Sequence, residues 1–181
     1  MTVLIDACVL YPTVLRELAL GAANKGLFQP LWSERILEEW QRAAARNGPQ
    51  DAGIASLEIE AVTAIFPDAS VTYSEETEER LKLPDENDRH VLAAAIDGGA
   101  DELLTLNVKD FPTNILMAEG IMRRHPDEFL LELLNSHPNK MNLVLEEVLS
   151  RAQSHEIDTS NRRALMKRAK LPRFGKALDQ L

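Results

Sequence analysis

The segment DENDRHVLAAAIDGGADELLTLNVKDF, residues 85–111, places a helix, a turn and a buried strand in one continuous run. Its first part, DRHVLAAAID, has small and apolar residues at helical spacing, as expected of a helix packed closely on a sheet. Gly98 and Gly99 end that helix, and DELLTL follows as an apolar run of strand length. A helix that leads directly into a buried strand favours an α/β fold.

The rest of the N-terminal two thirds repeats this alternation. Strands are expected at residues 2–6, 27–32, 69–73 (ASVTY), 101–106 and 114–120 (NILMAEG). Helices are expected at residues 13–26, 33–47 (with Ser33 as N-cap), 51–65, 74–81 and 88–97. Strands that alternate with helices predict a central parallel sheet with helices on both faces.

Beyond about His125 the sequence shows only helical patterns, in pieces at residues 127–135, 139–153 and 160–170. A chain of 181 residues is long enough for one domain with an added helical part, but short for two full domains. We therefore expect an α/β domain over residues 1–122 and a helical C-terminal extension over residues 123–181.

Composition restricts the class of protein. The chain is 45% hydrophobic and 27% charged, which is typical of a globular protein. It contains no apolar run of the roughly 20 residues that a membrane span needs, and no signal-peptide pattern at its start. With Cys8 as its single cysteine, it can form no intrachain disulfide. We expect a cytoplasmic protein without a membrane partner.

The net charge of −9 is unevenly distributed. Residues 1–119 have a charge balance of −12, whereas residues 120–181 have +3. Seven basic residues and no acid occur between Ser160 and Lys176, among them Arg162, Arg163, Lys167 and Arg168. This basic tail has two interpretations: an ordinary charged surface, or a set of phosphate contacts that draws RNA toward an acidic domain.

Several acidic and amide side chains follow predicted strands. Asp6 ends the first strand, Asn107 and Asp110 follow the strand at 101–106, and Asp88 lies in the first turn of the alanine-rich helix. In parallel sheets such positions converge beyond the carboxyl ends of the strands. Carboxylates gathered without basic partners repel one another unless a cation is present, and Mg²⁺ or Mn²⁺ favours oxygen ligands. Such ions can activate water against a phosphodiester.

Four pieces of the chain resemble the PIN-domain nucleases, and among them the VapC-type toxins. They are VLIDACVLYP, SERILEEW, LPDENDRHVLAAAIDGGAD and LLTLNVKDFP, which occur in the family's order and spacing over about residues 1–120. The resemblance implies a compact α/β fold around a parallel sheet and a metal-dependent ribonuclease site holding Mg²⁺ or Mn²⁺.

The resemblance also implies which side chains bind the metal. Asp6 matches the first acid of the family and Asp88 the third. The second acid falls on Glu39, with Glu38 as the alternative; Glu39 is favoured because it is next to Trp40, on the side that Ile36 also marks as buried.

A fourth acid is expected after Thr105. The family position holds Asn107 here, and Asp110 follows three residues later. Either side chain could complete the site, and Asn107 supplies an amide oxygen without charge. Cys8 stands where many relatives have Asn or Ser; we interpret it as a packing or supporting residue and not as a nucleophile.

The predicted function is therefore that of a metal-dependent endoribonuclease, the toxin of a type II toxin–antitoxin pair. The resemblance implies an RNA substrate, with transfer RNA among the candidates, a cognate antitoxin protein and homodimerisation. The alternative is a catalytically weak PIN-fold module that binds RNA or protein. An α/β phosphatase is disfavoured because it needs a second Asp at the position of Cys8. Cleavage of RNA that depends on a divalent cation would distinguish the endoribonuclease from the binding module.

Overall fold

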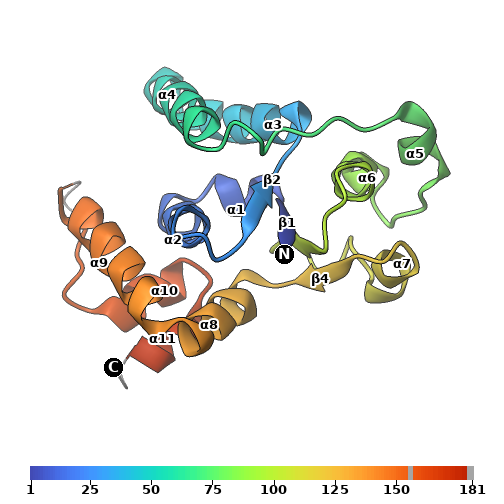
Figure 1. Ribbon diagram of the computed structural model, residues 1–181. Coiled ribbons are helices and arrows are strands. Elements are labelled where there is room, and N and C mark those ends of the chain that lie inside the picture. Colours follow the sequence, from blue (N-terminus) through green and yellow to red (C-terminus); the bar gives the residue numbers. More distant parts are fainter. Residues whose placement is uncertain (155–156, 179–181) are drawn as a thin grey trace. The chain divides into compact units, whose positions relative to one another are not determined.

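The computed structural model describes residues 1–154 and 157–178, and its elements are labelled in Figure 1. The chain divides into two compact units: Met1–Tyr11 with Gln29–Arg124, and Pro12–Phe28 with His125–Leu181. In the described part, every helix is too short or too polar to cross a lipid bilayer. The expected boundary after residue 122 lies close to the start of the second segment of unit two, which also includes residues 12–28.

The first unit is built on a four-stranded sheet in the order β2-β1-β3-β4, with every pairing parallel. Its strands are β1 Thr2–Ile5, β2 Gln29–Leu31, β3 Glu102–Leu104 and β4 Met122–Arg124. Leu4 of β1 is opposite Leu31 on one side and Leu103 on the other. Both faces of β1 are covered, since Val3, Leu4 and Ile5 have no exposed surface. The predicted parallel α/β architecture is confirmed.

Helices follow these strands in the same unit. They are α1 Ala7–Leu10, α3 Glu34–Ala45, α4 Pro49–Ile65, α5 Glu75–Arg80, the 3₁₀ helix η1 Glu86–Asp88, α6 Arg89–Asp97 and α7 Thr113–Ala118. Helix α6 packs on β1 and β3, and α3 packs on α1 and α4. The small residues Ala93, Ala94 and Ala95 are wholly buried, which lets α6 approach the sheet closely.

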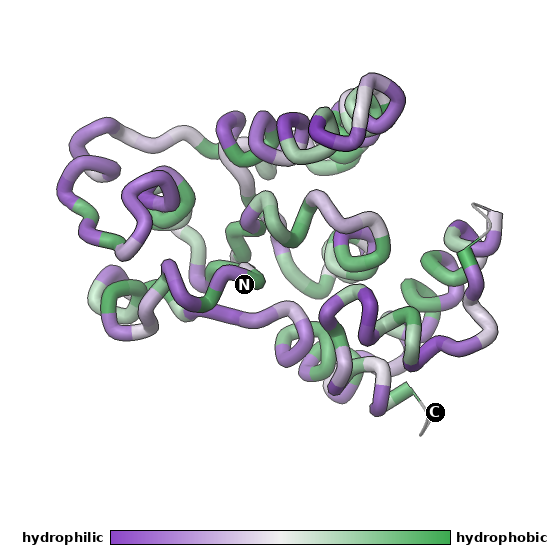
Figure 2. Tube along the Cα trace, turned by 180° about the vertical axis from the view of Figure 1, so that it is seen from behind, coloured by the Kyte–Doolittle hydropathy of each residue, from purple (hydrophilic) through white to green (hydrophobic). Residues whose placement is uncertain are grey.

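Capping follows the sequence signals in two of these helices. Ser33 Oγ accepts a 3.3 Å hydrogen bond from the backbone N–H of Ile36 at the start of α3. Ser74 does the same for Thr77 at the start of α5, at 3.1 Å. Helix α5 has no buried residue, and Figure 2 shows this stretch as mainly hydrophilic. The predicted acidic surface helix is confirmed.

The prediction of a strand at residues 69–73 was wrong. Only a single bridge forms there, between Ser70 and Trp32. The backbone N–H of Trp32 donates to Ala69 O at 2.9 Å, and that of Val71 donates to Trp32 O at 2.9 Å. The ladder stops because the chain turns at Ser33 to begin α3, so no further backbone groups are available to pair.

The prediction of a strand at residues 114–120 was also wrong. This stretch forms α7, which Gly120 terminates with a φ of +76°. The last strand is β4, whose sequence MRR carries no apolar pattern. An edge strand that pairs on one side only does not need apolar side chains, so periodicity gave no signal for β4.

The second unit is helical. It contains α2 Thr13–Asn24, α8 Pro126–Ser136, α9 Pro138–Ser154, α10 Arg162–Arg168 and α11 Pro172–Ala177. Gly21 lets α2 and α9 approach closely, because a Cβ at this position would lie 2.6 Å from a Val144 methyl group. Phe28 and Phe129 pack edge to face with ring centroids 5.1 Å apart. The three expected C-terminal helices correspond to α8, α9 and α10, and α11 was not predicted.

Candidate active site

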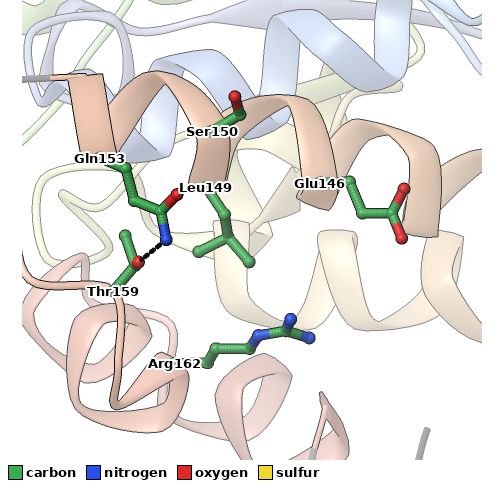
Figure 3. A pocket seen from close by; sticks show the side chains of 6 residues that line it. All are labelled: Glu146, Leu149, Ser150, Gln153, Thr159 and Arg162. Atoms are coloured by element: carbon green, nitrogen blue, oxygen red, sulfur yellow. Dashed lines mark hydrogen bonds between the residues drawn. The ribbon is translucent and has the colours of Figure 1, made fainter.

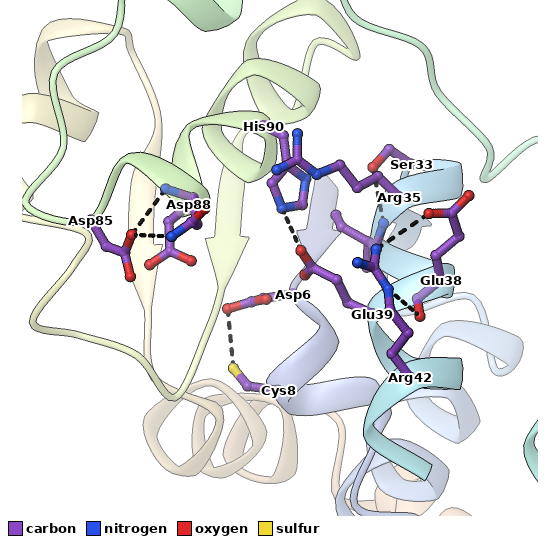
Figure 4. A network of polar contacts seen from close by, with 12 residues as sticks. Asp6, Cys8, Ser33, Arg35, Glu38, Glu39, Arg42, Asp85, Asp88 and His90 are labelled. Atoms are coloured by element: carbon purple, nitrogen blue, oxygen red, sulfur yellow. Dashed lines mark hydrogen bonds and ion pairs between the residues drawn. The ribbon is translucent and has the colours of Figure 1, made fainter. Parts of the chain in front are cut away.

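Asp6 lies at the end of β1, where the sheet presents it beside the neighbouring strand. Its backbone N–H donates to Leu104 O at 3.1 Å, so the register of β1 and β3 fixes its position. The side chain is 7% exposed and does not cap α1. Instead, Oδ2 accepts a 2.6 Å hydrogen bond from Thr105 Oγ1 and a 3.1 Å bond from Cys8 Sγ. Two side chains therefore hold the carboxylate, and Figure 4 shows the contact with Cys8.

Thr105 and Cys8 support the carboxylate of Asp6, Thr105 from a buried position and Cys8 from a partly exposed one. Thr105 is wholly buried, and its Oγ1 also accepts a 2.9 Å bond from the backbone N–H of Asn107. Cys8 Sγ accepts a 3.2 Å bond from the backbone N–H of Leu106. Burial, followed by the charge of Asp6, raises the pKa of the Cys8 thiol far above its usual range. Cys8 is thus a protonated donor, which matches the supporting role expected for it.

Asp88 is the last residue of η1 and the N-cap residue of α6. Its side chain makes no helix-capping bond, but Oδ2 accepts a 3.0 Å hydrogen bond from Asn107 Nδ2. Burial raises the pKa of Asp88 to about 6, and the negative charges of Asp6, Asp85, Asp110 and Glu39 contribute to the same rise. The shift therefore reflects burial first and the charges of the neighbouring acids second.

Glu38 and Glu39 are neighbours on α3 but have different surroundings (Figure 4). Glu38 forms an exposed pair with Arg42, with Oε2 3.2 Å from Nη2. Glu39 is one-third exposed, and its Oε1 lies 2.8 Å from Nε2 of the buried His90. That contact has the distance of an ion pair but not the geometry of a hydrogen bond. Of the two acids, only Glu39 is among the charges that raise the pKa of Asp88.

Asp85 and Asp110 are two further acids whose charges raise the pKa of Asp88. Asp85 Oδ1 accepts 2.9 Å bonds from both the backbone N–H and the Nδ2 of Asn87, so it serves the turn before α6. Asp110 is partly buried in the turn before Phe111. Its negative charge contributes to the raised pKa of Asp88. Asn107, by contrast, contacts Asp88 directly through its amide group.

The donor chemistry suits a hard divalent cation, although the side chains do not form a closed metal cage. Among the described residues, no group of three or more His, Cys, Asp and Glu side chains is arranged to hold a metal ion. None of the salt bridges in the described chain involves Asp6 or Asp88. Clustered carboxylate oxygens without a basic partner, one of them with a raised pKa, fit Mg²⁺ or Mn²⁺.

The predicted RNA-binding residues belong to the second unit. Arg162, Arg163, Lys167 and Arg168 are all exposed on α10, whose buried residues are Leu165 and Met166. Asn161 caps this helix by accepting a 2.9 Å bond from the backbone N–H of Ala164. The candidate metal-binding carboxylates belong to the first unit.

Arg162 also borders a surface pocket of about 220 Å³ in the second unit (Figure 3). The pocket is lined by Glu146, Leu149, Ser150, Gln153, Thr159 and Arg162. Gln153 Nε2 donates a 2.7 Å bond to Thr159 Oγ1 across its wall. Because an acid and a base share this lining, the pocket has no clear preference for an anionic group.

His90 is the residue at this site that the sequence did not assign. Its imidazole has no exposed surface and contacts Glu39. The available signal was its position inside an otherwise apolar helical run, because a buried polar side chain normally requires a partner.

A family model for the PIN domain matches residues 2–109. A 58-residue segment is 41% identical to a Mycobacterium tuberculosis protein named "Putative ribonuclease VapC50". This segment covers 32% of the chain and 34% of that relative, so the match spans about a third of the relative's length. No solved structure matches the chain.

Proposed function

This chain belongs to the PIN-domain family, and on that premise we propose that it is a metal-dependent endoribonuclease, the toxin of a type II toxin–antitoxin system. The observation that carries the proposal is the held geometry of two acids at the carboxyl end of the sheet: Thr105 and Cys8 hold Asp6, and Asn107 holds Asp88. Burial first, and then the charges of the neighbouring acids, raises the pKa of Asp88 to about 6, which supports the same proposal. The name of the partly matching relative also contains the word ribonuclease. Neighbouring carboxylates repel one another, and a bound cation with a preference for oxygen ligands relieves that repulsion.

In this proposal Asp6, Glu39 and Asp88 hold one or two Mg²⁺ or Mn²⁺ ions. When bound, such a cation lowers the pKa of water and offsets the charge that develops on a phosphodiester. Thr105 and Cys8 hold Oδ2 of Asp6, so the direction of its carboxylate is set before any substrate arrives. No His is required as a general base in this scheme.

Asn107 and Asp110 share the role of the fourth acid. Nδ2 of Asn107 donates a 3.0 Å hydrogen bond to Oδ2 of Asp88. Asn107 therefore orients Asp88, which is one of the proposed metal ligands. Asp110 contributes the negative charge that an amide lacks, as its effect on Asp88 supports. We assign Asp110 to charge and Asn107 to orientation.

The substrate and partners follow from the same proposal. RNA, with transfer RNA among the candidate targets, supplies the phosphodiester, and Arg162, Arg163, Lys167 and Arg168 supply exposed positive charge for its backbone. A cognate antitoxin would block the acidic site with a basic side chain, and two copies of the toxin would form a homodimer.

The deciding experiment is cleavage of a mixed small-RNA pool by the antitoxin-free protein with Mg²⁺, Mn²⁺ or a chelator. Asp88→Asn should abolish cutting, because it removes a ligand charge while retaining the side chain's shape. Asp68→Asn, at an exposed turn, is the matched control and should cut like wild type. Cutting that survives in chelator, or in Asp88→Asn, would contradict the proposal.

A second candidate is a binding module that retains the fold without efficient cleavage. Two observations favour it: Asn107 stands where the family has an acid, and the described side chains form no closed metal cage. In that case wild type and Asp88→Asn would bind RNA alike and neither would cut it with any metal.

A further inference from the structure

His90 is a buried polar side chain that the proposed chemistry does not use. It lies in the first turn of α6, two residues after Asp88, and its relative exposure is 0%. Neither Nδ1 nor Nε2 forms a hydrogen bond with the residues that the structure describes. A buried imidazole without hydrogen bonds is unfavourable, so its retention in an apolar helix needs a reason.

Glu39 is the polar group within reach of this imidazole. Its Oε1 lies 2.8 Å from Nε2 of His90. Tyr73 contacts the ring as an aromatic neighbour, with centroids 6.4 Å apart. Arg35, one helical turn before Glu39, pairs with Glu78 at 3.0 Å. The short contact across α3 and α6 is therefore the one that gives His90 a polar partner.

The side chains of His90 and Glu39 differ in conformational freedom. His90 is enclosed by the packed face of α6, whereas Glu39 is one-third exposed on a long, flexible stem. A fixed donor beside a mobile carboxylate restricts the carboxylate and leaves its second oxygen available. A small rotation of either side chain would convert the 2.8 Å contact into a hydrogen bond from Nε2–H to Oε1.

We infer that His90 is a positioning residue that fixes the carboxylate of Glu39 toward the cation site. This inference rests on the proposed function, because it concerns a ligand of the proposed metal. The role requires only an N–H group at Nε2 that faces Oε1 of Glu39. His90 acts through Glu39 and contacts neither RNA nor the cation.

The test is a double-mutant cycle read by Mn²⁺ affinity, measured by calorimetry on full-length protein without RNA. His90→Leu removes the donor and should weaken Mn²⁺ binding by about 10-fold or more, the range seen when a ligand's outer partner is removed. His90→Gln retains an N–H donor and should recover most of that affinity. In a Glu39→Gln background, His90→Leu should have no further effect.

Controls separate this inference from the function on which it rests. Glu38→Gln, which alters the exposed neighbour, should bind Mn²⁺ like wild type. Thermal unfolding of each variant verifies that it is folded. If Glu39→Gln and Asp88→Asn bind Mn²⁺ normally, the proposed metal site itself is wrong. If those two variants lose affinity while His90→Leu does not, or if the His90 and Glu39 effects add, the positioning role is overturned.

Discussion

Thr105 Oγ1 donates a 2.6 Å hydrogen bond to Oδ2 of Asp6, joining two residues that are 99 positions apart in the chain. The bond exists because Ile5 and Leu104 are partners in the parallel register of β1 and β3, which places the next residue of each strand side by side. The central sheet thus determines how the first acid of the candidate site is held.

Replacing Thr105 with Val tests this bond, because Val has nearly the same shape but no hydroxyl group. Removing a donor from a buried carboxylate should lower the free energy of unfolding by about 1–3 kcal/mol. Mn²⁺ affinity should fall too, since Asp6 is no longer fixed. Urea unfolding and Mn²⁺ titration measure the two effects. Thr105→Ser retains the donor, and a Ser variant as impaired as Val would show that packing, not the bond, matters.

Asp88 should make stability depend on pH. Its pKa is raised to about 6 in the folded protein, above the ordinary value of 3.8. The folded state therefore holds this proton more tightly than the unfolded state, and ionisation of Asp88 destabilises the fold. That destabilisation is fully present above pH 6, shrinks as the pH falls, and is absent below the ordinary value.

The Asp88→Asn variant isolates this contribution in metal-free protein. It should unfold at a higher temperature than wild type at about pH 7.5, and the difference should vanish near about pH 4. Asp68→Asn, which replaces an exposed Asp, should show no such trend. Differential scanning calorimetry across this range checks the expectation; a variant less stable than wild type at the higher pH would contradict it.

The sequence predicts strand ends better than it predicts contacts between helices. Asp6, Thr105 and Asn107 follow short apolar runs, and parallel pairing then brings them together without further information. The edge strand β4 was missed because its sequence, MRR, has no apolar pattern, and the apolar residues of α7 resembled a strand. These errors lie at the edge of the sheet, where burial constrains the side chains least.

The approach of α3 to α6 could not be inferred from either helix alone. Periodicity placed Glu38 and Glu39 beside the apolar face of α3, and both alternatives remained open. The difference between them arises from their partners: Arg42 on the same helix for Glu38, and the distant His90 for Glu39. Only the packing of one helix against another element reveals which acid has the buried partner.

In the second unit, Asp127 connects two helices and should be important for stability. It is 4% exposed, and its two oxygens accept bonds from the backbone N–H groups of Arg173 at 3.0 Å and Phe174 at 2.9 Å. Asp127→Ala leaves these donors at the start of α11 unpaired and should cost about 1–3 kcal/mol.

Glu128 offers the matched comparison for Asp127. It pairs with Arg173 through exposed side chains, with Oε1 2.5 Å from Nη1. Glu128→Ala should therefore cost less than about 1 kcal/mol. Chemical denaturation of both variants measures the difference. Equal losses would mean that the buried caps are not what holds α11 to α8.

The basic residues of α10 should control how RNA binding responds to salt. Replacing Arg162, Arg163 and Lys167 with Gln removes three exposed charges. Each of these charges that neutralises a phosphate should contribute about 0.7 to the slope of log affinity against log salt. The triple variant should therefore bind a single-stranded RNA more weakly, with a slope lower by about 2. An Asp88→Asn background prevents cutting during the measurement.

A control variant removes the same charge elsewhere, at the exposed residues Arg46, Lys82 and Lys140. If α10 contacts the RNA backbone, this variant should keep a slope close to that of the parent protein, because scattered charges do not displace counterions from the bound strand. Equal slopes in the two variants would contradict a contact between α10 and the RNA backbone. The effect would then depend on the net charge of the protein and not on the position of the charges.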